Sequence, residues 1–558
     1  MQKFLESYGI LVQENIKDKN VEIDKNTITI HNSNISEIDL NILKQKQINK
    51  ITITNCEIDY IYFADDNIEL FFIDCIFKNQ IIVRGFSFHR KVSFIQCIFE
   101  KKVSFSSTIF GNQVDFGLTK FEDEVRFIET KFLAEYTNQE NIENNFREAV
   151  FKDKAYFDST EFKARVDFNV ARFEGETRFV NTKFLAEYTN QENIENNFRE
   201  AVFKGKTSFT RAKFKARVDF NMVRFDNEAR FIDTSFFKNT VIFSEVEFNN
   251  IKFISDKKLN ETNTNNIVDQ IYHFQDTTFK GIVNFENTYI KDLNFKNVIF
   301  NNIVVFDNAA LYNKPKFINC TFSNQFNIKQ EHIQYNFKDI NKDSNNLTNL
   351  PNLENTNKDD DFTKPSNLRD LFRKLKSNRI AHHNLIDASE LRAQELYARE
   401  LELKHKKNKK LKETIEQYQL FFYHKLCDHH TDLILNLKWL IISIGIFASM
   451  LFMIKLYKCG LSILNIFNFY GLYLSALGSF ILSALALFRC IDKMKAFVSI
   501  ILWVICYKPK LIFGIANLIG DNSYNAFENL LITIYTLIAG LIIFSLQKTA
   551  RKNTIIPN

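Results

Sequence analysis

The sequence repeats one pattern in three consecutive units: VSFIQCIFEKK (92–102), VSFSSTIFGNQ (103–113) and VDFGLTKFEDE (114–124). Each of these three units is eleven residues long and carries phenylalanine at its third and eighth positions. The spacing between successive large apolar residues therefore alternates between five and six positions. A short period held over many units is typical of a solenoid, in which each unit buries its apolar face only against its neighbours.

The ladder of large apolar residues runs without a slip from residue 72 to residue 132, with valine in place of phenylalanine only at position 83. Burying one phenylalanine side chain contributes roughly 1.5–3 kcal/mol, so the ladder predicts the core of the domain. Its phenylalanines are Phe72, Phe77, Phe88, Phe94, Phe99, Phe105, Phe110, Phe116, Phe121, Phe127 and Phe132.

A second column of small or β-branched residues lies two positions before most ladder residues, as Cys75, Cys97 and Thr108 do. Residues two apart in an extended strand face the same way, so both columns point inward and the polar residues between them face water. Cys75 and Cys97 are two units apart. This spacing indicates one four-sided coil for every two units, or about 22 residues, a period typical of repeat architectures.

These units resemble the pentapeptide-repeat family, in its aromatic variant with an eleven-residue double unit. The resemblance covers about residues 50–326, half of the chain. It implies a right-handed quadrilateral β-helix with phenylalanine stacked along its interior. We therefore expect a mainly β solenoid over residues 51–326, an N-terminal cap region at 1–50 and an all-α transmembrane region after the solenoid.

Two identical insertions interrupt the ladder, because residues 131–151 and 183–203 have the same sequence. The loops 133–145 and 185–197 each add eight residues, and the whole duplication is 52 residues long. Without the loop it is 44 residues, or two coils, so both loops should leave the same edge about 10 Å apart. We interpret the pair as a candidate recognition feature; the alternative is a tolerated loop copied by duplication.

The composition of the chain changes after the expected solenoid. Residues 327–366 are rich in Asn, Asp, Lys and Thr and read as a flexible linker, and 367–432 as an amphipathic helical region. That region holds a basic cluster that is a candidate for contact with anionic lipid, the alternative being a solvated helix face. The cluster consists of Lys404, Lys406, Lys407, Lys409, Lys410 and Lys412.

Residues 433–548 contain the apolar spans. The segments 439–457, 461–488 and 527–546 are each long enough to cross a membrane, whereas 496–519 is either one kinked span or a re-entrant hairpin. Basic residues after the last span predict a cytoplasmic tail at 549–558, and we expect no signal peptide at the N-terminus. We expect four crossings, although Lys455 and Lys458 would then lie outside.

No catalytic or cofactor-binding constellation is apparent in the sequence, so we predict that the protein is not an enzyme. His424, Cys427, His429 and His430 lie close together before the first span. A zinc site is usually fuller and spaced for tetrahedral closure, so we predict no metal site there. The eight cysteines show no paired framework, which is consistent with a reducing compartment.

Charge excludes one role known for the family the repeats resemble, the mimicry of DNA by an acidic rod. Residues 51–326 hold about 35 basic and 39 acidic residues, whereas a phosphate mimic needs dense negative charge. We therefore expect no nucleic-acid partner.

The hypothesis that remains is a bacterial, membrane-anchored scaffold, with the solenoid in the cytoplasm and a multi-pass anchor in the inner membrane. It would present its repetitive surface and paired loops to protein partners. The alternative is an ion channel or channel-regulating subunit, motivated by the 496–519 segment and by Asn465 and Asn468.

Overall fold

The computed structural model describes residues 2–13, 17–63, 67–134, 143–186, 195–255, 270–334, 364–406, 408–460, 469–487, 492–507 and 525–550. The chain divides into two units, Met1–Gln334 and Tyr335–Asn558. The first unit is a β-solenoid of about twelve turns over residues 27–327, and the second is helical.

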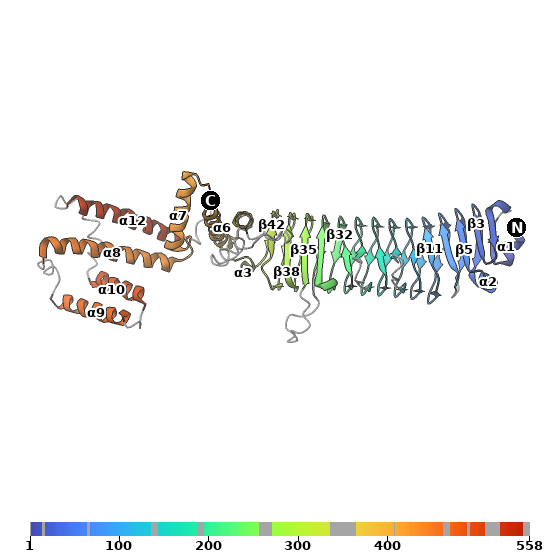
Figure 1. Cartoon of the computed structure of the whole chain (residues 1–558), viewed down its shortest axis with the longest axis horizontal. Coiled ribbons are helices and arrows are strands. Elements are labelled where there is room, and N and C mark those ends of the chain that lie inside the picture. The colour runs from blue at the N-terminus through green and yellow to red at the C-terminus, as the bar shows by residue number, and fades with distance from the viewer. Residues whose placement is uncertain are drawn as a thin grey trace. The chain divides into compact units, whose positions relative to one another are not determined.

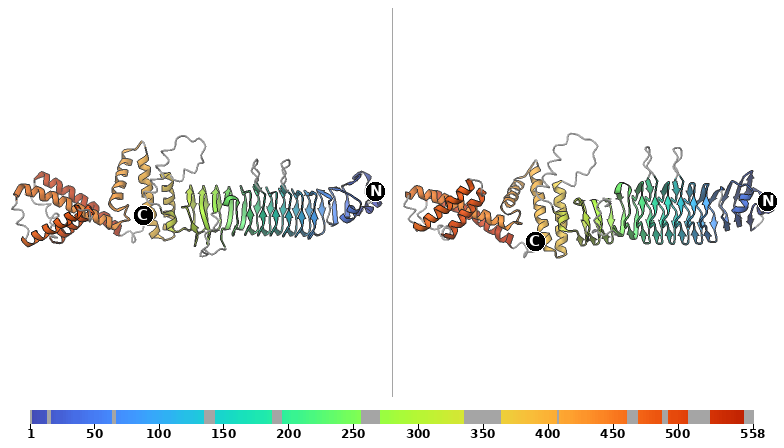
Figure 2. Two further views of the ribbon diagram at one scale, coloured as in Figure 1. Left: turned by 60° about the horizontal axis from the view of Figure 1, so that its bottom comes forward. Right: turned by 90° about the horizontal axis from the view of Figure 1, so that it is seen from below.

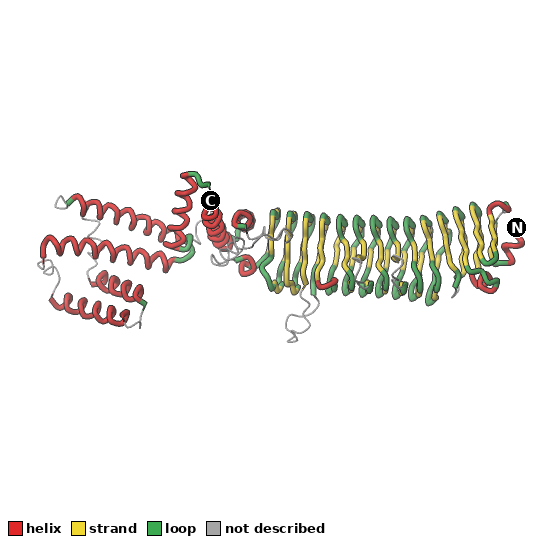
Figure 3. The backbone as a smooth tube through the Cα atoms, in the orientation of Figure 1, coloured by secondary structure: helices red, strands yellow, loops and turns green. Residues whose placement is uncertain are grey.

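One coil of the solenoid has four short strands, one on each side: β11 (Val92–Ile95), β12 (Ile98–Phe99), β13 (Val103–Ser104) and β14 (Ile109–Phe110). The next strand, β15 (Val114–Asp115), returns onto β11 in parallel and pairs Val92 with Val114. Each coil therefore takes about 22 residues and stacks on the one before it (Figures 1 and 3). The four-sided coil expected from the sequence is confirmed.

Repetition of this coil builds sheets that run along the solenoid (Figure 2). One side is a ten-stranded sheet and another is a six-stranded sheet, and further on a five-stranded sheet extends over both of these sides. The ten-stranded sheet contains β2 (Val21–Asp24), β3 (Thr27–His31), β5 (Lys50–Thr54), β7 (Glu69–Ile73), β11, β15, β19 (Glu143–Asn145), β23 (Arg165–Asp167), β27 (Glu195–Asn197) and β31 (Arg217–Asp219). The five-stranded sheet contains β33 (Thr240–Ser244), β35 (Gln270–Gln275), β38 (Tyr289–Lys296), β41 (Ala310–Leu311) and β42 (Lys316–Ile318). The six-stranded sheet contains β10 (Ser87–Phe88), β14, β18 (Lys131–Phe132), β22 (Glu161–Phe162), β26 (Lys183–Phe184) and β30 (Lys213–Phe214).

The two remaining sides merge into one 23-stranded sheet, because its two longer strands near residues 224–252 turn a corner and belong to both sides. Its strands are β1 (Ile10–Val12), β4 (Asn34–Asp39), β6 (Glu57–Tyr62), β8 (Ile76–Phe77), β9 (Ile81–Ile82), β12, β13, β16 (Lys120–Phe121), β17 (Val125–Arg126), β20 (Val150–Phe151), β21 (Ala155–Tyr156), β24 (Arg172–Phe173), β25 (Thr177–Arg178), β28 (Val202–Phe203), β29 (Thr207–Ser208), β32 (Arg224–Arg230), β34 (Glu247–Lys252), β36 (Thr278–Phe279), β37 (Val283–Asn284), β39 (Ile299–Phe300), β40 (Val304–Val305), β43 (Thr321–Phe322) and β44 (Phe326–Asn327).

Four columns of stacked phenylalanine rings fill the interior, one column along each side. In every ladder phenylalanine from residue 72 to residue 132 the side chain is at most 1% exposed. Rings of successive coils lie nearly parallel, with centroids between 4.5 Å (Phe184 and Phe214) and 5.7 Å (Phe105 and Phe127) apart. Rings of neighbouring columns meet edge to face, as Phe127 and Phe146 do at 5.7 Å. Both arrangements are favoured between aromatic rings.

The second inward column ties one coil to the previous one through side-chain hydrogen bonds. The hydroxyl of Thr130 donates to the carbonyl oxygen of Phe105 at 2.7 Å, and that of Thr182 donates to Phe157 at 2.6 Å. The thiol of Cys97 donates in the same way to Phe72 at 3.4 Å. Threonine and cysteine therefore suit this column because each buries a donor that finds a carbonyl one coil away.

Residues in the left-handed region of the Ramachandran plot form one corner in each half-coil, immediately before the second column. Polar residues such as Gln96 occupy many of these corners, as the scarcity of glycine indicates, but Leu118 and Val170 occupy others. At Val170 φ is 58°. A β-branched residue is strained at such a φ, because its branched Cβ approaches the backbone closely.

The coils begin earlier than residue 51, the start expected from the family resemblance. Strand β3 already pairs in parallel with β5, and the inward residues there are isoleucines such as Ile28 and Ile51. The phenylalanine ladder could not mark these coils because isoleucine fills them. Strands β1 and β2 instead pair antiparallel with β4 and β3. The helices of this unit are α1 (Gln2–Ser7), η1 (Asp18–Asn20), α2 (Leu40–Gln45), η2 (Phe237–Asn239) and α3 (Gln330–Ile333).

The second unit consists of helices in its described part. Two of them, Leu433–Lys458 within α8 and Ala526–Ala550, are long and apolar enough to cross a membrane by length and composition. They contain the expected spans 439–457 and 527–546, whereas α9 and α10 contain shorter apolar stretches. The helices are α5 (Pro365–Ala381), α6 (Leu385–His405), α7 (Leu411–Cys427), α8 (Leu433–Cys459), α9 (Phe469–Leu487), α10 (Lys493–Tyr507) and α12 (Ala526–Ala550) (Figure 1).

Replacing one ring in the middle of a column should weaken the solenoid strongly. Phe127 stacks between Phe105 and Phe157, so Phe127→Ala should cost about 3–5 kcal/mol. Pulse proteolysis of the full-length protein across a urea series measures the loss as a lower midpoint for cleavage. Ile82→Ala is the matched control, because Ile82 is 58% exposed and should shift the midpoint little. Equal shifts for the two variants would contradict the stacked-ring core.

Relieving the strain at one corner should stabilise the same unit. Asparagine tolerates the left-handed conformation, so Val170→Asn should raise the free energy of unfolding by about 1 kcal/mol. The control is Val180→Asn, at a half-buried valine that is not among the residues with positive φ. The urea midpoint should rise only for the first variant, and a rise for both would point to solubility rather than backbone strain.

Candidate functional site

The outer surface of the solenoid carries charges that pair between successive coils. Lys78 and Glu100 lie 2.9 Å apart, and Lys102 and Glu124 lie 2.7 Å apart, with each pair spanning one coil. Exposed pairs of this kind contribute little stability, but they cancel each other's field. The same arrangement recurs at Lys152–Glu122, Lys204–Glu174, Lys252–Glu228 and Lys280–Glu247.

The anchor points of the two duplicated loops lie in register on the solenoid. Strand β18 leads into the first loop and β26 into the second, and β22 alone separates them in the six-stranded sheet. On the return side β23 separates β19 from β27. The loops thus leave the same corner two coils apart, as the sequence indicates. Residues 135–142 and 187–194 lie outside the described residues.

A second cluster of polar side chains lies in the helical unit, where α6 and α7 meet the turn before α8. Helix α6 packs on α5 through the ion pair of Lys376 and Glu395 at 2.7 Å. The guanidinium of Arg399 joins α6 to α7 by two hydrogen bonds to Glu416, both 2.9 Å long. These contacts hold α6 against α5 on one side and against the first half of α7 on the other.

The rings of two histidines contact the carboxylate of Glu400, in α6, at this junction. The Nδ1 atom of His424, near the end of α7, lies 3.0 Å from Oε2 of Glu400. The Nε2 atom of His429, in the following turn, lies 3.3 Å from the same oxygen. The side chain of His429 has no exposed surface and that of Glu400 is 9% exposed. The cluster is therefore largely shielded from water.

Glu400 is ionised in this cluster despite its burial. Burial alone would raise the pKa of its carboxyl group, but hydrogen bonds from His424 and His429 outweigh that effect and lower the pKa to about 2. Tyr397 closes the cluster on another side. Its ring centroid lies 5.5 Å from that of His424 and 4.9 Å from that of His429, and its hydroxyl donates to Asp428.

The turn that carries His429 has an unusual backbone. Asp428, His429 and His430 all have positive φ, at 50°, 52° and 70°. Such residues cost of order 1–3 kcal/mol each and persist only where their surroundings hold them. Asp428 ends α7 in the left-handed conformation, and the turn folds His429 back onto α6.

Cys427 and His430 face a different set of partners. The hydroxyl of Ser545 in α12 donates to Sγ of Cys427 at 3.3 Å, and Nδ1 of His430 lies 3.3 Å from the hydroxyl oxygen of Thr549. Burial lowers the pKa of His430 to about 4, so it is neutral near pH 7. The four residues that the sequence grouped together thus split into two pairs.

The sequence could not indicate Glu400, the residue that joins His424 and His429. It lies 24 residues before His424 on another helix, and no spacing relates the two. The basic cluster lies nearby in sequence, at the end of α6 and the start of α7. Lys404, Lys406, Lys410 and Lys412 are exposed, whereas Lys407 lies outside the described residues.

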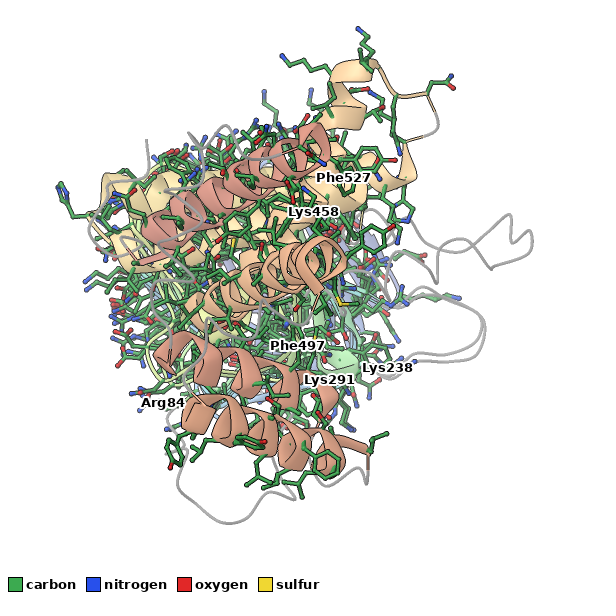
Figure 4. All side chains as sticks on the ribbon, turned by 90° about the vertical axis from the view of Figure 1, so that its left-hand side faces the viewer. Arg84, Lys238, Lys291, Lys458, Phe497 and Phe527 are labelled. Carbon is green, nitrogen blue, oxygen red and sulfur yellow. The ribbon has the colours of Figure 1, made fainter. Side chains whose placement is uncertain are left out.

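The two candidate membrane helices form an antiparallel pair fastened at both ends. Near one end the side-chain amide of Asn436 in α8 donates to the hydroxyl of Ser545 in α12 at 3.0 Å. At the other end Nζ of Lys458 lies 2.9 Å from Oε2 of Glu528, beside Phe527 (Figure 4). Between them the rings of Phe447 and Tyr535 lie 5.1 Å apart. Lys458, which the sequence left unexplained, therefore has a carboxylate partner.

No protein-family model, curated protein or solved structure matches the chain.

Breaking the ion pair at the end of the helix pair should loosen α8 from α12. Glu528 is 2% exposed, so Glu528→Gln should lower the free energy of unfolding by about 2 kcal/mol, less than a fully buried pair because Lys458 is partly exposed. The fluorescence of the two tryptophans, Trp439 in α8 and Trp503 in α10, should show the loss as a lower thermal midpoint in detergent. A double-mutant cycle with Lys458→Gln provides the control, and additive effects of the two changes would contradict the pairing.

Proposed function

We propose that this protein is a non-enzymatic scaffold anchored in a bacterial inner membrane, with its solenoid in the cytoplasm. The observation that carries the proposal is the combination in one chain of a solenoid filled by stacked rings with helices of membrane-spanning length. A filled interior favours display of the outer surface over catalysis in a central cavity. Repeat domains commonly bind partners through such extended surfaces.

The paired loops are the part of that surface that we assign to partner recognition. The parallel ladders of β18, β22 and β26 hold their anchors, so the two identical segments begin at a fixed separation. Rigid presentation of loops is a frequent basis of binding. Charges beside the loop anchors pair between coils, as Lys183 does with Glu161 and Arg165 with Glu143, so we assign protein rather than nucleic acid as the partner.

The antiparallel helix pair supports the proposed orientation. The start of α8 lies beside the end of α12. The residues just before α8 and those at the end of α12 therefore lie on the same side of the membrane. Lys548 and the exposed lysines of the basic cluster follow or precede that end of the pair, and the positive-inside rule supports our proposal that this side is cytoplasmic. In this proposal the remaining crossings come from the apolar segments that contain α9 and α10.

The architecture of the coil also supports the proposal that the solenoid belongs to the pentapeptide-repeat family. Its four sides, its repeat of about 22 residues and its inward phenylalanines have the form that the family resemblance implies. The competing channel hypothesis rests on Asn465, Asn468 and the 496–519 segment. Both asparagines and residues 508–519 lie outside the described residues, so we base no function on them.

Site-specific photocrosslinking in cells tests the scaffold. A photoreactive residue at Tyr136 or Tyr188, one in each loop, should give the same discrete protein adduct from the membrane fraction. Tyr312, which is 77% exposed and distant in sequence from the loops, is the matched control and should not give it. Membranes should retain the protein through alkaline carbonate washing. Release by carbonate, or loop positions that crosslink no better than Tyr312, would refute the proposal.

A further inference from the structure

The side chains of Glu400, His424 and His429 form a donor set suited to a transition metal. Two imidazole nitrogens and one carboxylate oxygen come from α6, α7 and the turn after α7. Hard cations such as Ca²⁺ and Mg²⁺ prefer oxygen ligands alone, whereas imidazole favours Zn²⁺ and its neighbours in the first transition row. Two histidines and one glutamate, with a fourth position open to water, are a known zinc ligand set.

The spacing of these atoms is close to that of a zinc coordination shell. Ligand atoms bound at about 2.0–2.1 Å in a tetrahedral site lie about 3.3 Å from one another. The corresponding separations here are 3.0 Å from Glu400 to His424 and 3.3 Å from Glu400 to His429. All three ligand atoms lie within 4.8 Å of one another, so small side-chain movements would close the site.

The burial of His429 has no sufficient explanation in the contacts of the cluster. Its Nδ1 atom has no hydrogen-bond partner among the described residues, although the side chain is fully buried. A buried polar atom without a partner costs roughly 1–3 kcal/mol, and the left-handed turn adds to that cost. A bond from Nε2 to a metal ion would contribute free energy that compensates for these costs, and Nδ1 would then carry the ring proton.

The surroundings also fit a bound ion. Tyr397 packs on both imidazole rings and donates to Asp428, so it restricts the orientation of the histidines. Ligand side chains whose rotamers are restricted by packing hold a site more precisely. Cys427 and His430 are held instead by Ser545 and Thr549 and do not join the set.

We propose that Glu400, His424 and His429 bind one Zn²⁺ ion that fastens α6 and α7 to the turn leading into α8. Each histidine coordinates through the nitrogen that faces Glu400, and any proton on that nitrogen is released to solvent when the ion binds. The ion would stabilise the folded helical unit, because a preformed site is absent from the unfolded chain.

Zinc titration of the full-length protein in detergent tests the site. After removal of metal by a chelator, the protein should bind one Zn²⁺ per chain and its thermal midpoint should rise. Glu400→Gln and His429→Gln should weaken binding by more than the roughly 10- to 100-fold cost of losing an outer-shell contact. His430→Gln, one residue from His429, is the matched control and should bind as the unaltered chain does. Absence of stoichiometric binding, or an equal loss in the control, would overturn the proposal.

A ligand exchange covers the case in which these variants do not fold. His424→Cys keeps a metal ligand at the same position, so Co²⁺ in place of Zn²⁺ should acquire a sulfur-to-cobalt charge-transfer band that the unaltered protein lacks. The spectrum of the unaltered protein with Co²⁺ should be that of a tetrahedral nitrogen and oxygen site. If His424→Cys binds Co²⁺ without the new band, the ion lies elsewhere and the assignment is wrong.

Discussion

Stacking of phenylalanine rings at the repeat distance of a β-ladder is the constraint on which the solenoid depends. Parallel strands lie about 4.8 Å apart, and ring centroids in the columns lie between 4.5 and 5.7 Å apart. The backbone ladder and the ring column therefore have nearly the same period. Any residue that moves a ring out of its column loses the stack, its edge-to-face neighbours and the hydrogen bonds of its strand together. This coupling explains why one residue type is repeated so faithfully.

Regular spacing made most of this unit predictable from the sequence, because a period in the chain becomes a column in space. The coil length, the inward columns and the register of the loop anchors all follow from counting residues. Residues that do not follow the phenylalanine repeat were harder to predict. The coils around Ile28 and Ile51 use isoleucine, and the left-handed corner at Val170 carries a residue that no corner rule would select. The hydrogen-bond acceptors of Thr130 and Cys97 could not be predicted, because they are carbonyl groups of the neighbouring coil.

The helical unit was predictable only in its helices, since its decisive contacts join residues far apart in the chain. Apolar length indicated the spans within α8 and α12. Nothing in the sequence related Glu400 to His429, Cys427 to Ser545 or Lys458 to Glu528. Each is a single contact between different helices, fixed by how the helices pack rather than by a repeat. The histidine group before α8 was visible as a cluster, yet its division into two pairs depended on where α6 and α12 lie.

The need to keep the phenylalanine rings in their columns also explains the form of the duplication in the solenoid. An inserted segment keeps the ring columns in phase only if it adds whole coils, with any remainder held outside the ladder. The duplication of 52 residues meets this condition, because 44 residues make two coils and eight lie in each loop. Strand pairing across the first loop joins Phe121 to Phe151, which are separated along the chain by one coil plus the extra residues of the loop. The number of coils and the position of the loops are thus linked. A duplication preserves the ring columns only if it adds whole coils, and such a duplication brings the copied loop to the same corner.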